Sequence, residues 1–391
     1  MASCGDSGAT AGRTLAYPTS APSASQTAQQ ERGQVVATTS ALDAWRSRLP
    51  AGTRVTRMTY RSTSGVDGSS TTVTGAVFVP PGSWPAGGWP LIAYAHGTTG
   101  ITRDCAPSDQ PDMFGDLRAV NSFLNGGYAV VTTDYQGLGV RTDEKAPHPY
   151  LEPRTAAYNV IDSVRAARSL EPTISDRWLV SGASQGGAAA WSTAEEVAAY
   201  GGGAGRLGSG QLIGAVAVAP VLDATYLVQR AQKGELTTAQ RYLYPIVVSG
   251  AAQTDSSIHP GDYLNGVAEQ QRTTLISCSG GKTALAAQMG QPDASMFTAV
   301  NPGAGQLLES LLTRFSLPRT KTSVPILAIY GSDDAIIPVD VMEQTLGDGC
   351  AVGDTLTRVR REGQGHALDP GPVLANWVAD RLVGRRLQSD C

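Results

Sequence analysis

Short apolar runs alternate with helix-like segments along most of the chain. The apolar runs have the length of buried strands and cover residues 90–95, 128–133, 178–180, 212–219, 324–330 and 355–359. The segments with helical composition or periodicity cover residues 114–124, 155–170, 185–200 and 372–382. Strands that alternate with helices predict an α/β fold, in which helices flank a mostly parallel central sheet.

Two regions depart from this alternation. Residues 54–61 and 72–80 alternate around a turn rich in serine and glycine, which predicts a β-hairpin. Residues 222–321 lack convincing strands, and their best helices are 237–248 and 305–315. The second of these helices carries a leucine-rich stripe. The stripe packs on a small core of its own, lines a substrate pocket, or does both.

These patterns divide the chain into three parts. We expect an α/β core at 35–221 and 322–391, interrupted by a helical cap or lid at 222–321. Residues 1–34 are expected to be a flexible tail, because residues 7–30 are rich in Ser, Ala, Thr, Gln and Gly.

Composition and charge argue against several classes of protein. Of the 391 residues, 41% are hydrophobic and 16% are charged, so disorder of the whole chain is not expected. The formal net charge of −4 does not support binding to nucleic acid. The chain has no run of about 18 apolar residues, the length that a spanning helix requires. We therefore expect no transmembrane segment.

The sequence Gly-Ala-Ser-Gln-Gly at 182–186 matches the G-x-S-x-G nucleophile elbow. It stands between a predicted strand and a predicted helix, which is the context that the elbow requires. In such a turn the serine lies at the carboxyl edge of the sheet, and the glycines avoid clashes with neighbouring backbone. Ser184 is therefore the candidate nucleophile.

An acid and a histidine follow this serine in the chain order that the elbow fold uses. The strand at 324–330 leads into Gly-Ser-Asp-Asp, and Asp334 stands three residues after the glycine. Asp333 and Asp340 are the rival acids, and His366 is the only histidine that follows them. We expect His366 to accept the serine proton and Asp334 to orient the imidazole. This chemistry needs no cofactor and no metal, and we expect neither.

An oxyanion that develops during acyl transfer needs fixed hydrogen-bond donors. In this fold one donor is the backbone N–H after the nucleophile, here that of Gln185. The other comes from the loop after an early strand, here His-Gly-Thr-Thr-Gly at 96–100, in which we choose Thr98. We interpret His96 as a structural hydrogen-bonding residue, and His148 and His259 as loop residues.

The five cysteines contain no CxxC pair, and only four histidines are present, so no zinc module is expected. Their wide spacing and the position of Cys391 as the last residue favour disulfides in an oxidising compartment. Five free thiols in a cytosolic protein are the alternative. The residues around Cys4 are similar to the end of a bacterial lipoprotein signal, in which the cysteine carries lipid. The alternative for Cys4 is a spare thiol on the tail.

Six motifs together resemble those of the secretory lipases, the yeast lipase A type with actinobacterial relatives. They are His96-Gly-Thr98, Asp134-Tyr-Gln-Gly-Leu-Gly139, Pro147-His-Pro-Tyr150, the elbow at 182–186, the turn at Asp334, and Gly365-His366. The likeness runs from about residue 35 to the end of the sequence. It implies an α/β-hydrolase core with a helical cap inserted before the acid-bearing strand. It also implies hydrolysis of carboxylic esters, usually acylglycerols or short esters.

The same resemblance implies a pairing of the cysteines. Cys105 would pair with Cys278 and tie the core to the cap, and Cys350 would pair with Cys391. Cys4 would then be free or lipidated. The cysteine-bearing tail is the one departure from the family pattern.

We therefore expect an exported, monomeric lipase or esterase that forms an acyl-enzyme on Ser184, secreted or held at the cell surface through Cys4. Its substrates would be acylglycerols or other short- to long-chain esters, polyesters included. Acyl transfer to an alcohol and peptide hydrolysis use the same triad and are the related alternatives. The alternative from another class is a catalytically silent binding lipoprotein, against which the intact Ser184, Asp334 and His366 argue.

Overall fold

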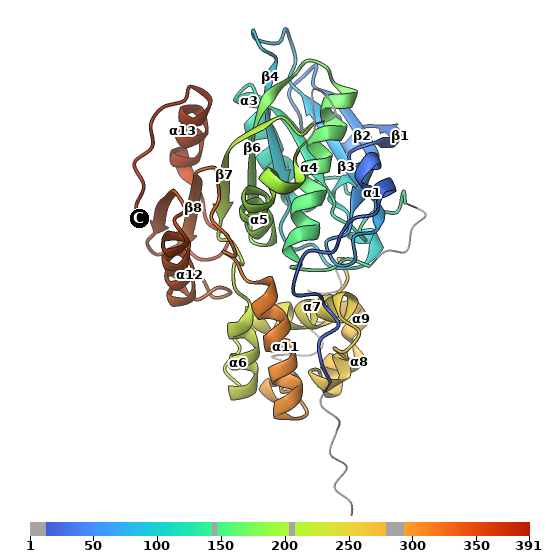
Figure 1. Cartoon of the computed structure of the whole chain (residues 1–391), viewed down its shortest axis with the longest axis vertical. Coiled ribbons are helices and arrows are strands. Elements are labelled where there is room, and N and C mark those ends of the chain that lie inside the picture. Colours follow the sequence, from blue (N-terminus) through green and yellow to red (C-terminus); the bar gives the residue numbers. More distant parts are fainter. Residues whose placement is uncertain (1–12, 143–146, 203–207, 279–292) are drawn as a thin grey trace, which may run out of the picture.

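The computed structural model describes residues 13–142, 147–202, 208–278 and 293–391 (Figure 1). Its centre is a nine-stranded sheet in the order β1-β2-β3-β5-β4-β6-β7-β8-β9. The strands are β1 (Val35–Ser40), β2 (Arg54–Thr63), β3 (Ser70–Val79), β4 (Trp89–Ala95), β5 (Ala129–Thr133), β6 (Ile174–Ala183), β7 (Gln211–Val218), β8 (Ile326–Gly331) and β9 (Leu356–Arg361). Neighbouring strands in the series β5-β4-β6-β7-β8-β9 run parallel to one another. The pairs β1–β2, β2–β3 and β3–β5 are antiparallel. The predicted mostly parallel sheet is confirmed, and the predicted hairpin is β2 with β3.

Side chains of the sheet alternate between two apolar cores, one on each face. In β4, Leu91 and Ala93 belong to one core, and Ile92 and Tyr94 belong to the other. Helices α4 and α5 cover the first core, while α3 and α13 cover the second. Because both faces are buried, the strands read as continuous apolar runs in the sequence.

Local capping residues and backbone conformation explain where helices around the sheet begin. They are α1 (Gln26–Glu31), α2 (Asp43–Arg46), α3 (Leu117–Asn125), α4 (Pro153–Leu170), α5 (Gln185–Tyr200), α12 (Val339–Val352) and α13 (Gly371–Leu382). Helix α4 starts two residues earlier than expected, because the Glu152 carboxylate caps it and Pro153 suits its first position. Helix α3 starts three residues later than expected, because Met113 and Phe114 both have a φ of 54°. Among the described residues, no helix combines the length and the apolarity needed to cross a membrane.

Between β7 and β8 the chain forms further helices, which Figure 1 shows together below the sheet. We call the described part of 222–321 the helical segment. It contains α6 (Thr225–Lys233), α7 (Thr238–Thr254), η5 (Pro260–Asp262), α8 (Gly266–Gln270), α9 (Arg272–Leu275), η6 (Ala294–Phe297) and α11 (Pro302–Phe315). The leucine stripe of α11 is buried against α6 and α7, but its leucines join the core under α4 and α5 instead of forming a separate one.

The N-terminal residues that the structure describes differ from the expected flexible tail. Tyr17 is only 2% exposed. Its backbone N–H donates to Asp255 (2.6 Å), its hydroxyl donates to Glu152 (2.6 Å), and its ring meets Phe315 edge-on. Composition could not predict these contacts, because they belong to a single aromatic residue in an otherwise polar stretch. Cys4 lies outside the described residues.

Two disulfides have the pairing that the resemblance implies. Cys105 bonds to Cys278, which joins the loop after β4 to the helical segment. Cys350, in α12, bonds to Cys391. Their Cα–Cα distances of 5.3 and 5.2 Å are ordinary for disulfides. The loop after the central strand β4 is therefore covalently tied to the helices that follow β7.

Candidate active site

Ser184 lies where β6 ends and α5 begins, with φ 56° and ψ −117°. A non-glycine residue in this conformation is strained, and such a strand-to-helix turn is typical of a nucleophile elbow. A Cβ on Gly186 would lie 2.0 Å from the carbonyl oxygen of Ala95, and one on Gly182 would lie 2.3 Å from that of Gly186. The two glycines therefore allow β4, β6 and α5 to approach closely enough to form the turn.

His366, after β9, and Asp334, after β8, meet Ser184 at the same edge of the sheet. The Nε2 atom of His366 lies 2.9 Å from Ser184 Oγ, and its Nδ1 atom lies 2.8 Å from Asp334 Oδ2. Because a carboxylate only accepts hydrogen bonds, Nδ1–H donates to Asp334 and Nε2 is left to accept the serine proton. The side chains of Asp334 and His366 are 3% and 20% exposed.

The geometry distinguishes Asp334 from the rival acids. Its Oδ1 atom accepts the backbone N–H groups two and three residues further on, at 2.8 and 2.9 Å. These bonds fix the carboxylate while Oδ2 contacts the histidine. Asp333 and Asp340 are both exposed, and neither is a hydrogen-bond partner of His366, whose Nδ1 contact goes to Asp334. Of the three acids, Asp334 is the one placed to orient the imidazole.

Side chains of the helical segment hold the turn that follows Asp334. Thr237 Oγ1 donates to the carbonyl of Ala335 (2.7 Å). The Gln240 amide and the Tyr226 hydroxyl donate to the carbonyl of Ile336 (2.8 and 2.9 Å). Sequence reasoning missed these contacts, because the partners lie about 100 residues apart and no local pattern links them.

Of the two residues predicted as oxyanion donors, Gln185 stands in the elbow and Thr98 in a neighbouring loop. Gln185 is the first residue of α5, and N–H groups in the first helical turn have no carbonyl partner within the helix. A Cβ on Gly97 would lie 3.9 Å from the Cβ of Ser184, so the loop that carries Thr98 passes beside the serine. The Thr98 hydroxyl lies 2.6 Å from the hydroxyl of Tyr150.

His148 makes more contacts than a simple loop residue. Its Nδ1–H donates to the carbonyl of Gln136 (2.8 Å), and its Nε2 lies 3.1 Å from the side-chain nitrogen of Gln185. Burial lowers the pKa of His148 to about 4, so the ring is neutral at neutral pH. With the proton on Nδ1, the Nε2 atom accepts a hydrogen bond from Gln185. The contact joins residues 37 positions apart, and the motif at 147–150 marks His148 without indicating its partner.

The other two histidines have the simpler roles that we expected. His96 places Nδ1 2.7 Å from the carbonyl of Gly97 and Nε2 3.2 Å from that of Asp134. It is buried and holds loop backbone. His259 is exposed and directly precedes η5.

The described residues contain one grouping with the spacing of metal ligands. It consists of Asp104, Cys105 and Cys278, whose ligand atoms lie within 4.8 Å of one another. The two sulfurs are bonded to each other, so they offer no thiolate to a metal. This grouping is therefore a disulfide with a neighbouring carboxylate.

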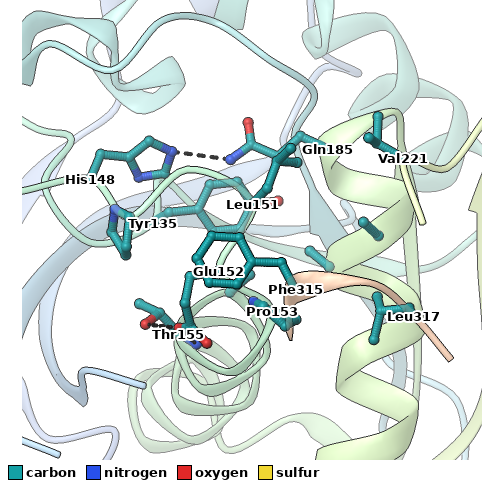
Figure 2. A pocket seen from close by; sticks show the side chains of 14 residues that line it. Tyr135, His148, Leu151, Glu152, Pro153, Thr155, Gln185, Val221, Phe315 and Leu317 are labelled. Atoms are coloured by element: carbon teal, nitrogen blue, oxygen red, sulfur yellow. Dashed lines mark hydrogen bonds between the residues drawn. The ribbon is translucent and has the colours of Figure 1, made fainter. Parts of the chain in front are cut away.

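A small cavity is lined in part by Gln185, and Figure 2 shows its lining. The cavity volume is about 20 Å³, which is room for roughly one water molecule. The lining includes the polar groups of Gln185, His148 and Glu152 and the apolar side chains of Phe315 and Leu317. Ser184 is not among the lining residues. The cavity therefore adjoins Gln185 without reaching Ser184, and it is too small to hold an acyl chain.

Comparisons with known proteins agree with this architecture. A model of the secretory lipase family matches residues 113–390. The rice cell wall degrading esterase LipA from Xanthomonas oryzae is similar, with TM-score 0.69 and 22% identity over 90% of this chain and 97% of that chain. Lipase A from Candida antarctica in its closed state has TM-score 0.69 and 15% identity over 92% and 84%. A putative hydrolase from Legionella pneumophila has TM-score 0.70 and 18% identity over 91% and 98%. These likenesses show the α/β-hydrolase fold, and no curated protein sequence matches the chain significantly.

Proposed function

The chain belongs to the secretory lipase family, and from this premise we propose that it is a serine carboxylic ester hydrolase. Family and fold make it a hydrolase of the lipase and esterase type. The observation that carries the finer proposal is the hydrogen-bonded series from Ser184 through His366 to Asp334. A nucleophile, a base and an orienting acid in this arrangement suit acyl transfer through a covalent intermediate.

The proposed reaction proceeds in two halves. Ser184 Oγ attacks the ester carbonyl carbon while His366 Nε2 takes the hydroxyl proton. The tetrahedral intermediate then expels the alcohol, which receives that proton, and an acyl-enzyme remains. Water attacks the acyl carbon with His366 again as base, the carboxylic acid leaves, and Ser184 regains its proton. Asp334 keeps the other imidazole proton on Nδ1 and stabilises the imidazolium.

Both tetrahedral intermediates place negative charge on the former carbonyl oxygen. We assign the backbone N–H groups of Gln185 and Thr98 as its donors, with the Thr98 hydroxyl beside them. The position of Gln185 at the start of α5 supports this, because the N-terminus of a helix favours negative charge. The approach of Gly97 to Ser184 supports the assignment of Thr98.

The helical segment is the proposed cap of the site, with bounds 222–321. Its contacts to the turn after Asp334 and its disulfide to the loop after β4 support this placement. The proposed substrates are acylglycerols and other short- to long-chain esters, polyesters included. The similar structures include a lipase and a cell wall degrading esterase.

We also propose that the protein works outside the cytoplasm. The family is one of secretory lipases, and the two disulfides suit an oxidising compartment. A lipid anchor on Cys4 and a monomeric state stay predictions from the sequence. Mass spectrometry of the N-terminal peptide and light scattering of the purified protein test them.

Turnover of p-nitrophenyl esters from acetate to palmitate tests the proposed function. Loss of a serine nucleophile costs on the order of 10⁶ in turnover in another serine hydrolase, so Ser184→Ala should fall to the background rate. Ser192→Ala is the matched control and should keep the wild-type rate. Ser192 is a buried serine of α5, the helix that follows Ser184, and its hydroxyl donates to the Ala189 carbonyl. The chain-length profile of the wild type separates a lipase from a short-chain esterase.

Three outcomes would contradict the proposal. Equal rates for the wild type and Ser184→Ala would remove the nucleophile assignment. A wild type that fails on esters but transfers acyl groups to alcohols, or cleaves amides, would point to the related alternatives that use the same triad. Inactivity on every acyl substrate, with no labelling of Ser184 by a fluorophosphonate, would favour a silent binding lipoprotein.

A further inference from the structure

Residues 147–150 contact both residues that we assign as oxyanion donors. The Tyr150 hydroxyl lies 2.6 Å from the Thr98 hydroxyl, and the His148 ring lies 3.1 Å from the Gln185 side chain. Thr98 stands in the loop after β4, whereas Gln185 begins α5. One short segment therefore joins the two halves of the assigned oxyanion site.

The Tyr150 hydroxyl can set the direction of the Thr98 proton. Tyr150 is 1% exposed, and burial raises its pKa, so the phenol stays protonated at neutral pH. Each hydroxyl carries a single proton. When Tyr150 donates to Thr98 Oγ1, the Thr98 proton is free to point toward an oxyanion on the carbon attached to Ser184.

The Gln185 side chain is hydrogen-bonded to the His148 ring, as the dashed line in Figure 2 shows, and this bond restricts its orientation. Its Nδ1–H is bonded to the carbonyl of Gln136, so Nε2 acts as the acceptor. The ring packs between Tyr135 and Tyr150, with centroid distances of 6.0 and 6.1 Å. Because Gln185 directly follows the nucleophile, a fixed side chain restricts rotation of the backbone that carries the assigned N–H.

Tyr135 supports the start of the same loop. Its hydroxyl donates to the carbonyl of His96 (3.1 Å), and the two rings lie 4.4 Å apart. Tyr135 has a φ of 65°, a left-handed conformation that is uncommon for an aromatic residue and persists only where the surroundings require it. Buried aromatic side chains therefore contact residues 96, 98 and 185, which surround the elbow.

We propose that His148 and Tyr150 are positioning residues of the oxyanion site, in which Tyr150 directs the Thr98 hydroxyl and His148 fixes Gln185. This inference rests on the proposed ester hydrolase function. Neither side chain touches the reacting atoms, and each acts through the residue that it holds. Their removal should therefore weaken binding of the transition state and leave binding of the substrate nearly unchanged.

The expected losses follow from what a donor itself contributes. Removal of one oxyanion donor lowers kcat about 10²- to 10³-fold in subtilisin. Tyr150→Phe leaves the Thr98 hydroxyl in place without direction, so we expect a loss of about 10- to 100-fold in kcat. His148→Phe keeps a ring in the aromatic stack but lacks Nε2, and we expect a loss of roughly 10-fold. KM should stay within about twofold in both variants.

Double-mutant cycles test whether each residue acts through its partner. Tyr150→Phe is combined with Thr98→Val, and His148→Phe with Gln185→Leu, which keeps the backbone N–H. Positioning predicts that each first substitution lowers kcat less than about twofold once the partner side chain is gone. Thr98→Ser keeps the hydroxyl, and in that background Tyr150→Phe should have its full effect.

Tyr263→Phe is the matched control. Tyr263 is fully buried in the helical segment, and its hydroxyl donates to the carbonyl of Ala304 in α11 (2.9 Å). A buried tyrosine hydroxyl contact is lost here too, but it lies between two parts of the helical segment, so kcat should not change. Rates are normalised to active sites titrated with a covalent serine inhibitor, which removes unfolded protein from the comparison.

The outcomes separate this inference from the proposed function. A wild type that does not hydrolyse esters would mean that the proposed function itself has failed. An active wild type with an unchanged kcat in Tyr150→Phe, or with losses that multiply independently in both cycles, would overturn the inference alone. Tyr150→Phe retains the buried ring, so its cycle decides the matter if His148→Phe does not fold.

Discussion

Two sides of the site around Ser184 are supported by different parts of the chain. One side carries the proposed acid and base, and the other carries the assigned oxyanion donors. The turn after Asp334 accepts hydrogen bonds from three side chains of the helical segment. Thr98 and Gln185 are held instead by side chains of residues 147–150, which precede α4 in the core. The side-chain hydrogen bonds that hold the acid turn therefore come from the helical segment, and those that hold the assigned oxyanion donors come from the core.

The proposed base is more exposed than several side chains that support the two sides. The His366 side chain is 20% exposed, whereas Tyr150, His148 and Gln240 are buried. A base must exchange protons with substrate and water, so it needs access to both. Oxyanion donors work best as fixed dipoles in a dry environment, and their supports are correspondingly buried. Four substitutions test how the two sides of the site are built and supported.

The largest effect should come from the acid. Asp334→Asn removes the carboxylate that keeps the imidazole proton on Nδ1, and the equivalent change in a serine protease lowers kcat by about 10⁴. We expect a loss of similar size here. Asp333→Asn is the control, because the neighbouring carboxylate is exposed and does not bond to His366, and it should keep the wild-type rate. Similar rates for the two variants in ester hydrolysis would contradict the assignment.

The next largest effect should be on stability, at the tight contact between the elbow and β4. A Cβ on Gly186 would lie 2.0 Å from the Ala95 carbonyl oxygen, so Gly186→Ala must push strand and helix apart. We expect a loss of about 3 kcal/mol or more in the free energy of unfolding. Gly347→Ala, in α12, meets open space and should instead gain about 0.4–1 kcal/mol. Urea unfolding of the two variants measures both values, and an equally stable Gly186→Ala would refute the tight contact.

On the side of the assigned oxyanion donors, His148 should make the folding stability depend on pH. Its folded pKa of about 4 lies below the usual value of about 6.5, because burial disfavours the charged ring. The unfolded chain therefore binds the proton first as the pH falls. The stability that His148 contributes is complete above about pH 6.5 and is lost as the pH falls toward 4, by roughly 2–3 kcal/mol.

His148→Phe should remove this part of the pH dependence. Urea unfolding at pH 7 and pH 4.5 gives the difference for each protein, and the wild type should lose more than the variant. His259→Asn serves as control, because its side chain is exposed and its loss should leave the dependence unchanged. Equal losses in the wild type and His148→Phe would show that the ring is not held neutral by burial.

The sheet and its flanking helices could be predicted because their signals are local. A strand buried on both faces is a continuous apolar run, and α5 has the bounds that its sequence predicts, Gln185–Tyr200. Strand β1 was missed because five of its six residues are exposed at the edge of the sheet. Helix α12 was missed because its glycines at 347 and 349 have low helix propensity.

In the candidate site, too, the sequence predicts some residues and not others. Ser184, Asp334 and His366 could be proposed because each follows a recognisable strand in a known order. The supports could not, because they are contacts between distant segments. His148 reaches Gln185 across 37 residues, and Thr237 reaches the acid turn across 98. Such pairs depend on how the helices pack, and that packing leaves no short motif in the sequence.

The smallest effect, and the sharpest test of the comparison, should come from Thr237. Its hydroxyl caps α7 by accepting the N–H of Gln240, and it also donates to the Ala335 carbonyl in the acid turn. Thr237→Ala should cost about 1 kcal/mol of stability, as loss of an N-cap does. It should also lower kcat about fivefold, because a hydrogen bond of about 1 kcal/mol no longer holds the turn.

Asn301→Ala is the matched control, because Asn301 caps α11 through the N–H of Ala304 and is not among the side chains that hold the acid turn. It should lose the same stability in urea unfolding and keep the wild-type kcat. Thr237→Ser retains the hydroxyl and should restore both properties. If the two alanine variants have equal kcat, the helical segment does not support the acid, and the two sides of Ser184 are not held separately. If kcat falls only in Thr237→Ala, the helical segment contributes to acid–base chemistry through a backbone turn, without contributing a reacting group.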